Sequence, residues 1–507
     1  MIPKLGYYPA DTKFPFTGLD VNTPAGWLEP GASPHNLNGV TFRGSLKKRL
    51  GFAQLGSTLN GGTEPVVKLW NFQKQDGTNL LVAFTPTKIY SYASGTWTDR
   101  TPVSVPFTGT EDNFIDVAEG VDVNLGRLIV AVNGKDGPIY WDGVASKFIA
   151  LPVNLASFVT AKTVAVFNSY LIFANIKTTS GWEPRSAAWS DTGVFTEWLA
   201  GNSGVLAEMN FDGEILRLIP YATNLVVFSR NTIGCLCYID PSVIFGSTIY
   251  VTGIKLIAPG AISYVNPYIM FVSQDNIHLW DGARVTVPCG DKIVPIIRTA
   301  GDPTYINRAN MFYDITTGQV RFVMPTGASS QRVLALESDL GVRSLAYVEG
   351  HSKLAMWYEE SYPVRMSSFG PYIASTGGQN VNSVVLGGSN GKVYVESGQL
   401  NDDGTAIQFI WDSGDITVPQ VYRSQYARWL ELEFEALGTA ISTYYSTDSG
   451  VTWTLIAATT LASTFMSYKM FFDTTSRVIR FRFTSNDVDS AFELAWYRAW
   501  LRPGAAR

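Results

Sequence analysis

The chain has 507 residues, of which 46% are hydrophobic, 13% aromatic and only 16% charged. This composition excludes a disordered protein, which needs low hydrophobicity and high net charge. The net charge of −5 and the isoelectric point near 5.4 exclude a protein that binds nucleic acid through one dominant basic surface. The 46 glycines, the 25 prolines and the many aromatic residues favour strands and turns over helices.

Residues 1–60 are rich in Pro and Gly and contain few long strand patterns, so we expect an extended arm. Four basic residues occur in this arm without an acidic residue among them: Arg43, Lys47, Lys48 and Arg49. Such a cluster is either the solvated face of a hairpin or an electrostatic contact with an acidic partner or DNA phosphates. The first residues lack the pattern of a signal peptide, and no apolar run approaches the roughly 18 residues of a membrane span, so we expect no membrane insertion.

Between residues 61 and 400 a unit of short strands repeats. In each unit an apolar strand, such as 80–84, is followed by a turn and a second strand that ends in aromatic residues. The anchors of five successive units, separated by 43 to 50 residues, are Tyr90, Tyr140, Trp189, Cys237 and Trp280. A period of roughly 40–50 residues with about four short strands per unit is typical of β-propeller blades. The alternative is a set of unrelated hairpins in a sandwich.

After a turn-rich boundary at 401–404, the repeat stops. Polar and apolar residues alternate strictly in 430–435 and 478–483, which predicts strands with one face in a core. Four tryptophans are expected in that core or at the junction with the propeller: Trp429, Trp453, Trp496 and Trp500. The predicted fold is therefore all-β, with an extended N-terminal arm at 1–60, a β-propeller of six or seven blades at 61–400 and a C-terminal β-sandwich at 401–507.

One motif in the C-terminal part has a known local structure. Ser446, Asp448, Gly450 and Trp453 match Ser-x-Asp-x-Gly-x-x-Trp, the Asp-box of sialidase-like propellers. In such a turn the carboxylate accepts backbone N–H bonds, Gly supplies a positive φ and Trp packs beneath. We interpret the motif as a structural turn and not as a catalytic site.

The sequence contains no recognisable catalytic or metal-binding pattern. It has no phosphate-binding loop, no dinucleotide-binding glycine motif and no nucleophile elbow. The three histidines are far apart, Cys235 and Cys237 have no second pair, and the odd number of cysteines predicts no disulfide framework. The arginines that a sialidase would need are scattered along the chain: Arg185, Arg217, Arg230, Arg298 and Arg308. We therefore predict a protein without enzymatic activity, catalytic residues, metal or cofactor.

Three stretches resemble the tail hub, or nozzle, proteins of short-tailed bacteriophages, also called packaged-DNA stabilisation proteins. The first is 30–52, where the matching positions are Asn36 or Asn38, Gly44, Leu46, Arg49 and Gly51. The second is 260–297, which is similar to a central blade of that family. The third is 477–502, which is similar to its final strands.

The resemblance implies a structural virion protein assembled in the host bacterial cytoplasm. Six copies would form a ring below the portal and adaptor, with tail fibre, spike or needle proteins attached beneath it. Double-stranded DNA would pass through the ring without sequence-specific binding, and the ring would help to retain and then release the genome. The acidic composition agrees with a channel that lets DNA slide. The alternatives are a carbohydrate-binding or sialidase-like propeller and another phage baseplate or fibre-attachment protein.

Overall fold

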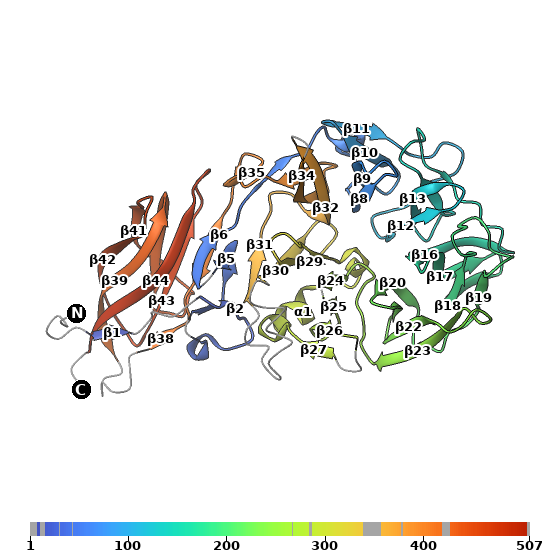
Figure 1. Cartoon of the computed structure of the whole chain (residues 1–507). Coiled ribbons are helices and arrows are strands. Elements are labelled where there is room, and N and C mark those ends of the chain that lie inside the picture. The colour runs from blue at the N-terminus through green and yellow to red at the C-terminus, as the bar shows by residue number, and fades with distance from the viewer. Residues whose placement is uncertain are drawn as a thin grey trace.

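The computed structural model describes residues 8–10, 16–29, 31–42, 44–265, 267–282, 286–337, 356–376, 379–417 and 426–503. Figure 1 shows a ring of small sheets joined to a second body of long strands. In the described part, the ring consists of seven four-stranded units. The predicted all-β propeller fold is confirmed, and the described residues form seven blades.

In each of the first five blades, four consecutive strands pair antiparallel, and the first strand is the innermost. Apolar residues fill both faces of the second strand of a blade, because neighbouring blades cover it on each side. The strands are β8 (Lys68–Gln73), β9 (Asn79–Phe84), β10 (Ile89–Ala93), β11 (Thr96–Asp99), β12 (Asp116–Asp122), β13 (Gly126–Val132), β14 (Ile139–Trp141), β15 (Ile149–Ala150), β16 (Phe158–Phe167), β17 (Tyr170–Thr178), β18 (Gly181–Trp189), β19 (Gly204–Leu206), β20 (Ile215–Tyr221), β21 (Asn224–Ser229), β22 (Thr232–Tyr238), β23 (Phe245–Thr252), β24 (Ile262–Val265), β25 (Tyr268–Val272), β26 (Ile277–Trp280) and β27 (Thr286–Pro288).

The last of the seven blades takes one of its strands from the N-terminal arm. Blade 6 contains β28 (Asn310–Tyr313), β29 (Gln319–Pro325), β30 (Gln331–Glu337) and β31 (Met356–Glu360). Blade 7 contains β32 (Met366–Thr376), β33 (Gln379–Gly388), β34 (Val393–Glu396) and, as its outer strand, β7 (Phe52–Gln54) from the arm. The ring is therefore closed by pairing of a strand that precedes blade 1 with the strands of blade 7.

A separate apolar cluster lies at each of the seven contacts between neighbouring blades. Between blades 1 and 2, for example, Phe72 and Phe84 pack with Trp141 and Phe148. These clusters explain the repeated aromatic residues in the sequence, because each blade has to bury both of its faces against its neighbours.

A single sheet of ten strands runs from blade 6 into the C-terminal domain. The connecting strand is β4 (Asn36–Leu37) of the arm, which pairs parallel to β31 on one side and antiparallel to β37 (Phe409–Asp412) on the other. The sheet continues through β43 (Val478–Ser485), β40 (Ala440–Ser446) and β41 (Thr454–Thr460), with β38 (Ile416–Thr417) paired beside β43. Main-chain hydrogen bonds therefore link the two domains directly.

The second sheet of the sandwich also contains arm strands. Its order is β42 (Met466–Ser476), β39 (Ala427–Gly438), β44 (Phe492–Pro503), β6 (Ser45–Lys48) and β5 (Gly39–Phe42), with β1 (Tyr8–Ala10) paired to β44. The described arm residues are thus integrated into the sandwich, the connecting sheet and blade 7. The arm is not an independent segment lying over finished domains.

The four tryptophans expected in the sandwich core differ in burial. Trp429 is fully buried between the two sheets. Trp453, Trp496 and Trp500 are only half-buried. Of the four tryptophans expected in the core or at the junction, Trp429 alone is fully buried in the core.

Short elements complete the described chain. They are the parallel pair β2 (Gly18–Leu19) and β3 (Ala32–Ser33), the hairpin β35 (Asn401–Asp402) and β36 (Thr405–Ala406), the helix α1 (Val294–Ala300), and the 3-10 turns η1 (Ala25–Trp27), η2 (Leu59–Gly62), η3 (Asp291–Ile293) and η4 (Ile306–Arg308). Among the helices described, none has the length and apolar character needed to cross a membrane.

Candidate functional site

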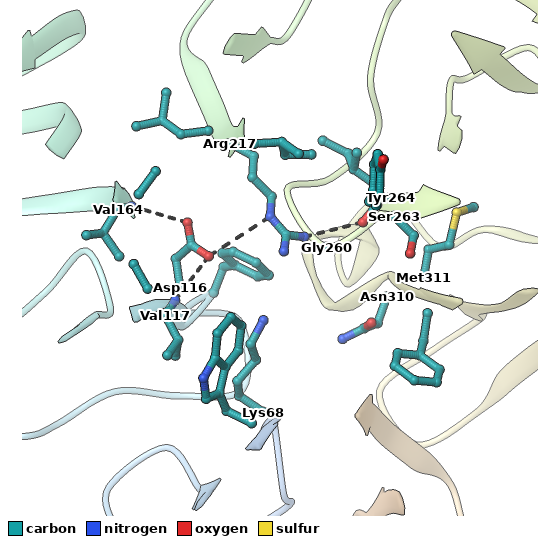
Figure 2. A pocket seen from close by; sticks show the side chains of 18 of the residues that line it. Lys68, Asp116, Val117, Val164, Arg217, Gly260, Ser263, Tyr264, Asn310 and Met311 are labelled. Atoms are coloured by element: carbon teal, nitrogen blue, oxygen red, sulfur yellow. Dashed lines mark hydrogen bonds and ion pairs between the residues drawn. The ribbon is translucent and has the colours of Figure 1, made fainter. Parts of the chain in front are cut away.

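The innermost strands of the seven blades surround a central cavity of about 450 Å³. Each blade contributes lining residues from its first strand or the residues just before it. Figure 2 shows side chains from several blades converging on this space. A volume of this size lies within the range of roughly 300–1,000 Å³ that is typical of small-molecule sites.

Two cations point into the cavity from different blades (Figure 2): Lys68 on β8 and Arg217 on β20. The Phe114 ring lies between them, 5.6 Å from the Lys68 Nζ and 5.4 Å from the Arg217 Cζ. The Trp70 ring lies 5.8 Å from the same ammonium. Cations over aromatic faces are stabilised by the ring quadrupole, but this interaction does not neutralise their charge.

Asp116 on β12 is a buried acidic group of the cavity wall. One of its oxygens accepts hydrogen bonds from the Thr163 hydroxyl at 2.6 Å and the Val164 amide at 3.2 Å. The other accepts from the Val117 amide at 3.1 Å and lies 4.0 Å from the Arg217 Nε. The carboxylate is therefore fixed mainly to its own and the next blade.

The cavity perturbs the titration of Lys68. Burial of the ammonium, and secondarily the positive charge of Arg217, lower the pKa of Lys68 to about 8, although Asp116 partly opposes the shift. A depressed lysine pKa means that the cavity disfavours the positive charge of this side chain. An additional negative group would relieve that cost.

A second hollow of about 230 Å³ shares Phe114 with the central cavity. Its charges are paired: Glu214 accepts from the Lys162 Nζ at 2.8 Å and from the Arg230 Nη2 at 2.9 Å. Burial opposes ionisation of Glu214, but these two cations hold its pKa below the usual value. This hollow therefore contains satisfied ion pairs and lacks the excess cation of the central cavity.

The basic cluster of the arm is largely enclosed by this chain. The Arg49 guanidinium is buried and donates to both carboxylate oxygens of Asp402, at 2.9 and 2.5 Å. Lys48 is also buried, and its Nζ donates to the Asp487 carbonyl at 3.4 Å. Lys47 forms an ion pair with Glu493 at 3.1 Å, and Arg43 lies outside the described residues. The expected contact with a partner or with DNA is thus wrong for Lys48 and Arg49, whose charged groups face this chain's own residues.

A buried polar network surrounds Arg49 at the junction of the arm, the propeller and the sandwich. Its Nε donates to Asn38 at 2.8 Å, and its Cζ lies 4.6 Å from the Tyr362 ring. Tyr362 donates to Glu360, which also accepts from the Arg321 Nε at 3.0 Å. Burial opposes the charge of Arg49, but the bonds to Asp402 offset this and raise its pKa. This polar network therefore links the N-terminal arm to the propeller and to the hairpin that contains Asp402.

The Asp-box forms the predicted turn. The Asp448 carboxylate accepts from the Ser446 hydroxyl at 2.6 Å and from the Thr452 amide at 2.9 Å, and Gly450 has a φ of 91°. These hydrogen bonds hold the pKa of Asp448 well below its usual value. Trp453 packs against Arg482, whose Cζ lies 4.0 Å from its ring. The hydrogen bonds of Asp448 thus stay within the motif, as expected for a structural turn.

The cysteines depart from the expectation in one respect. Cys235 and Cys237, two residues apart on β22, form a disulfide, and the sequence did not predict this bond. Cys289 is buried, which raises the pKa of its thiol. Within the described residues no group of three His, Cys, Asp or Glu side chains is placed to hold a metal ion.

The sequence did not predict the cavity: Arg217 was noted only as one of several scattered arginines, and Lys68 and Asp116 were not singled out. Lys68 and Arg217 are the only charged residues of β8 and β20, whereas Asp116 shares β12 with Glu119 and Asp122. A charged residue in the first strand of a repeat could have indicated a position that faces the axis of the ring.

No family model matches the chain, and no curated protein matches it. Similar solved structures include the extracellular domain of a hybrid two-component system from B. thetaiotaomicron (8% identity, TM-score 0.39, 69% of this chain and 40% of that one). They also include YCF48 from Cyanidioschyzon merolae (11%, 0.36, 68% and 98%) and an exo-β-1,3-galactanase from Phanerochaete chrysosporium (8%, 0.29, 88% and 98%). This chain therefore spans less than half of the first of these proteins.

The expectation of a protein without enzymatic activity is corrected by these neighbours. Two of them are glycoside hydrolases, the galactanase and a family 43 arabinoxylan arabinofuranohydrolase from Bacillus subtilis (11% identity, TM-score 0.26, 92% of this chain and 94% of that one). At these identities the likeness concerns the architecture alone, and it assigns neither a substrate nor a catalytic residue to this chain.

Proposed function

We propose that this chain is a subunit of a bacteriophage tail, in the hub or nozzle ring that continues the DNA channel below the portal and adaptor. The observation that carries the proposal is the ten-stranded sheet shared by blade 6 and the sandwich. Domains joined by a linker usually move relative to each other. The wall of a channel that holds packaged DNA has to keep its shape, and a continuous sheet serves that need.

The residues of the phage-like segment 30–52 support the proposal, because several lie where the domains are joined. Asn38 adopts a φ of 57° and donates to Ser361 at 2.8 Å and to the Gln408 carbonyl at 2.7 Å. A side chain at Gly51 would place its Cβ 1.9 Å from the Asn401 carbonyl oxygen. The backbone and contacts at Asn38, Arg49 and Gly51 allow few other residue types. A short motif of such residues can therefore indicate that two proteins join the arm, the propeller and the sandwich in the same way.

The partners follow from the same proposal. Six copies form the ring, an adaptor protein contacts it above, and fibre, spike or needle proteins attach below. Each subunit carries a net charge of −5. A ring of such subunits repels DNA phosphates on average, which favours passage of the duplex over tight binding.

The test is electron microscopy of purified particles of the phage that encodes this chain. We expect the chain in a six-fold ring directly below the portal and adaptor, with its density around the DNA channel. Arg49→Met, which disrupts the junction, should reduce incorporation into particles, whereas Lys177→Met on β17 of blade 3 should not. Absence of the chain from homogeneous, infectious particles, or its presence outside any ring, would overturn the proposal.

A further inference from the structure

We propose that the central cavity of the propeller binds a small molecule that carries an anionic group, a carboxylate or a phosphate monoester, on a ring. Lys68 and Arg217 contact the anionic group, and the aromatic walls contact the ring. This inference does not depend on the proposed tail function, because it concerns the interior of a single subunit.

The first support is the state of Lys68. Among the residues that the structure describes, its ammonium has neither a hydrogen-bond nor an ion-pair partner, and it faces the Trp70 and Phe114 rings. Lys162, on the next but one blade, has Glu214 at 2.8 Å. A half-buried ammonium that points into a cavity without a counterion is a position where an anionic ligand group gains electrostatic energy.

The second support is the charge balance of the cavity wall. Two acids belong to the lining, Asp116 and Glu119, and Glu119 is already paired with Arg127 at 2.5 Å. Asp116 accepts three hydrogen bonds from its own and the next blade, and its distance of 4.0 Å from the Arg217 Nε is at the limit of an ion pair. The two cations thus share one carboxylate, and the wall around Phe114 has one positive charge in excess.

Hydrogen bonds orient the guanidinium of Arg217, but they do not use all of its N–H donors. Its Nη1 donates to the carbonyls of Pro259 and Ile262 at 3.3 and 3.4 Å, which holds the guanidinium across the cavity (Figure 2). Within the described part of the chain its Nη2 has no hydrogen-bond acceptor. A fixed guanidinium with a free donor is suited to a carboxylate or phosphate oxygen.

The other residues that line the cavity indicate what kind of molecule carries the anionic group. Aromatic rings from five blades line the cavity: Trp70, Phe114, Tyr264, Phe312 and Phe369. Flat apolar rings favour a ligand with a cyclic body. Asn310 and Ser263 add polar groups to the lining for bonds to ligand hydroxyls. Tyr264 is 46% exposed, so the cavity reaches solvent beside it.

The test is titration calorimetry of the full chain with galacturonate, glucose 6-phosphate and neutral galactose. We expect one or both anions to bind and galactose to bind at least about tenfold more weakly, since a hydrogen bond to a charged group contributes roughly 1.5–3 kcal/mol. The two anions distinguish a carboxylate ligand from a phosphate ligand. Failure of both anions to bind more tightly than galactose would overturn the proposal.

Substitutions at the two cations test whether the anion binds in the central cavity. Lys68→Met and Arg217→Met should each weaken binding of the preferred anion by about ten- to a hundredfold. The matched control is Lys177→Met, because Lys177 also has its ammonium near an aromatic ring, 5.9 Å from Trp182, but does not line the cavity. Equal binding by Lys68→Met and by the wild type would place the anion elsewhere and overturn the proposal. Lys68→Met should fold normally, since the cavity disfavours the ammonium that it removes.

The pH dependence gives a second readout. Loss of the Lys68 proton as the pH rises through about 8 should weaken anion binding in the wild type. The other titratable groups at the cavity are Asp116 and Glu119 on β12, Arg217 on β20 and Tyr264 on β24. Free carboxyl groups, guanidinium groups and phenols in water change protonation well away from pH 8. The decline should therefore disappear in Lys68→Met, and a decline of the same size in that variant would contradict the assignment.

Discussion

The guanidinium of Arg49 and the carboxylate of Asp402 form a bidentate, buried ion pair between residues 353 positions apart. Arg49 belongs to the N-terminal arm, and Asp402 lies in the hairpin that follows blade 7. Their contact fixes the start of the chain against the segment that leaves the propeller for the sandwich. The pair thus marks the place where three parts of the molecule become one body.

Removing one member of this pair should be costly. Arg49→Met leaves Asp402 buried without its cation, and we expect a loss of about 3–5 kcal/mol in the free energy of unfolding. The measurement is denaturant unfolding, followed by near-ultraviolet circular dichroism. The double variant Arg49→Met with Asp402→Leu should recover much of the loss, because it removes the uncompensated charge. A cost below about 1 kcal/mol for Arg49→Met would show that the pair is peripheral.

Closure of the propeller by β7 can be tested at Phe52. This side chain is 1% exposed and packs on Tyr394 with ring centroids 4.7 Å apart. Phe52→Ala should cost about 3–5 kcal/mol, the usual range for a buried aromatic residue. Leu50→Ala is the control two residues earlier, because Leu50 is 58% exposed and should change stability by less than about 0.5 kcal/mol. Equal effects of the two variants would contradict the closure.

The sandwich tryptophans should differ in their contributions. Trp429 is completely buried, and Trp429→Ala should cost about 3–5 kcal/mol. Trp453 is half-buried above the Asp-box turn, so Trp453→Ala should cost clearly less. Thermal unfolding of both variants provides the comparison. A larger loss for Trp453→Ala than for Trp429→Ala would contradict the difference in burial between the two indoles.

One buried carboxylate predicts how stability depends on pH. Burial of Asp412 opposes ionisation, but Arg482, whose Nε and Nη2 donate to it at 2.6 and 2.7 Å, holds its pKa below the ordinary 3.8. A depressed acid contributes stability that is fully present above its unfolded pKa and is lost as the pH falls through its folded pKa. Wild type should therefore be more stable than Asp412→Asn at neutral pH, and the difference should shrink below about pH 4.

The control for this pH dependence is Asp473→Asn. Asp473 pairs with Arg428 on the surface, where both side chains are more than half exposed. Exposed pairs contribute little because water and salt screen them. Its stability difference from the wild type should stay small at every pH, and a pH dependence as large as that of Asp412→Asn would rule out burial as the cause.

Much of the propeller could be predicted from the sequence. The anchors Tyr90, Tyr140 and Trp189 recur because each blade needs an aromatic face for its neighbour, and that requirement is local to each unit. Alternation in 430–435 predicted a strand, and β39 confirms it, but Glu431 and Glu433 are buried as well, so the predicted single buried face is wrong. The Asp-box turn was also predictable, since its hydrogen bonds join residues within a few positions of one another.

Only the tertiary structure shows how the arm pairs with the rest of the chain and that a central cavity forms. The pairing of β7 with β34, of β4 with β31 and β37, and of Arg49 with Asp402 joins segments hundreds of residues apart. Hydrogen bonds between distant strands leave no local pattern, so a Pro- and Gly-rich arm looks the same whether it binds a partner or completes its own chain. Lys68, Asp116 and Arg217 likewise meet only because the closed ring brings the first strands of different blades to one axis. The sequence determined the blades, because each unit contains its own apolar and aromatic strands. Closure of the ring determined which charged side chains face one another.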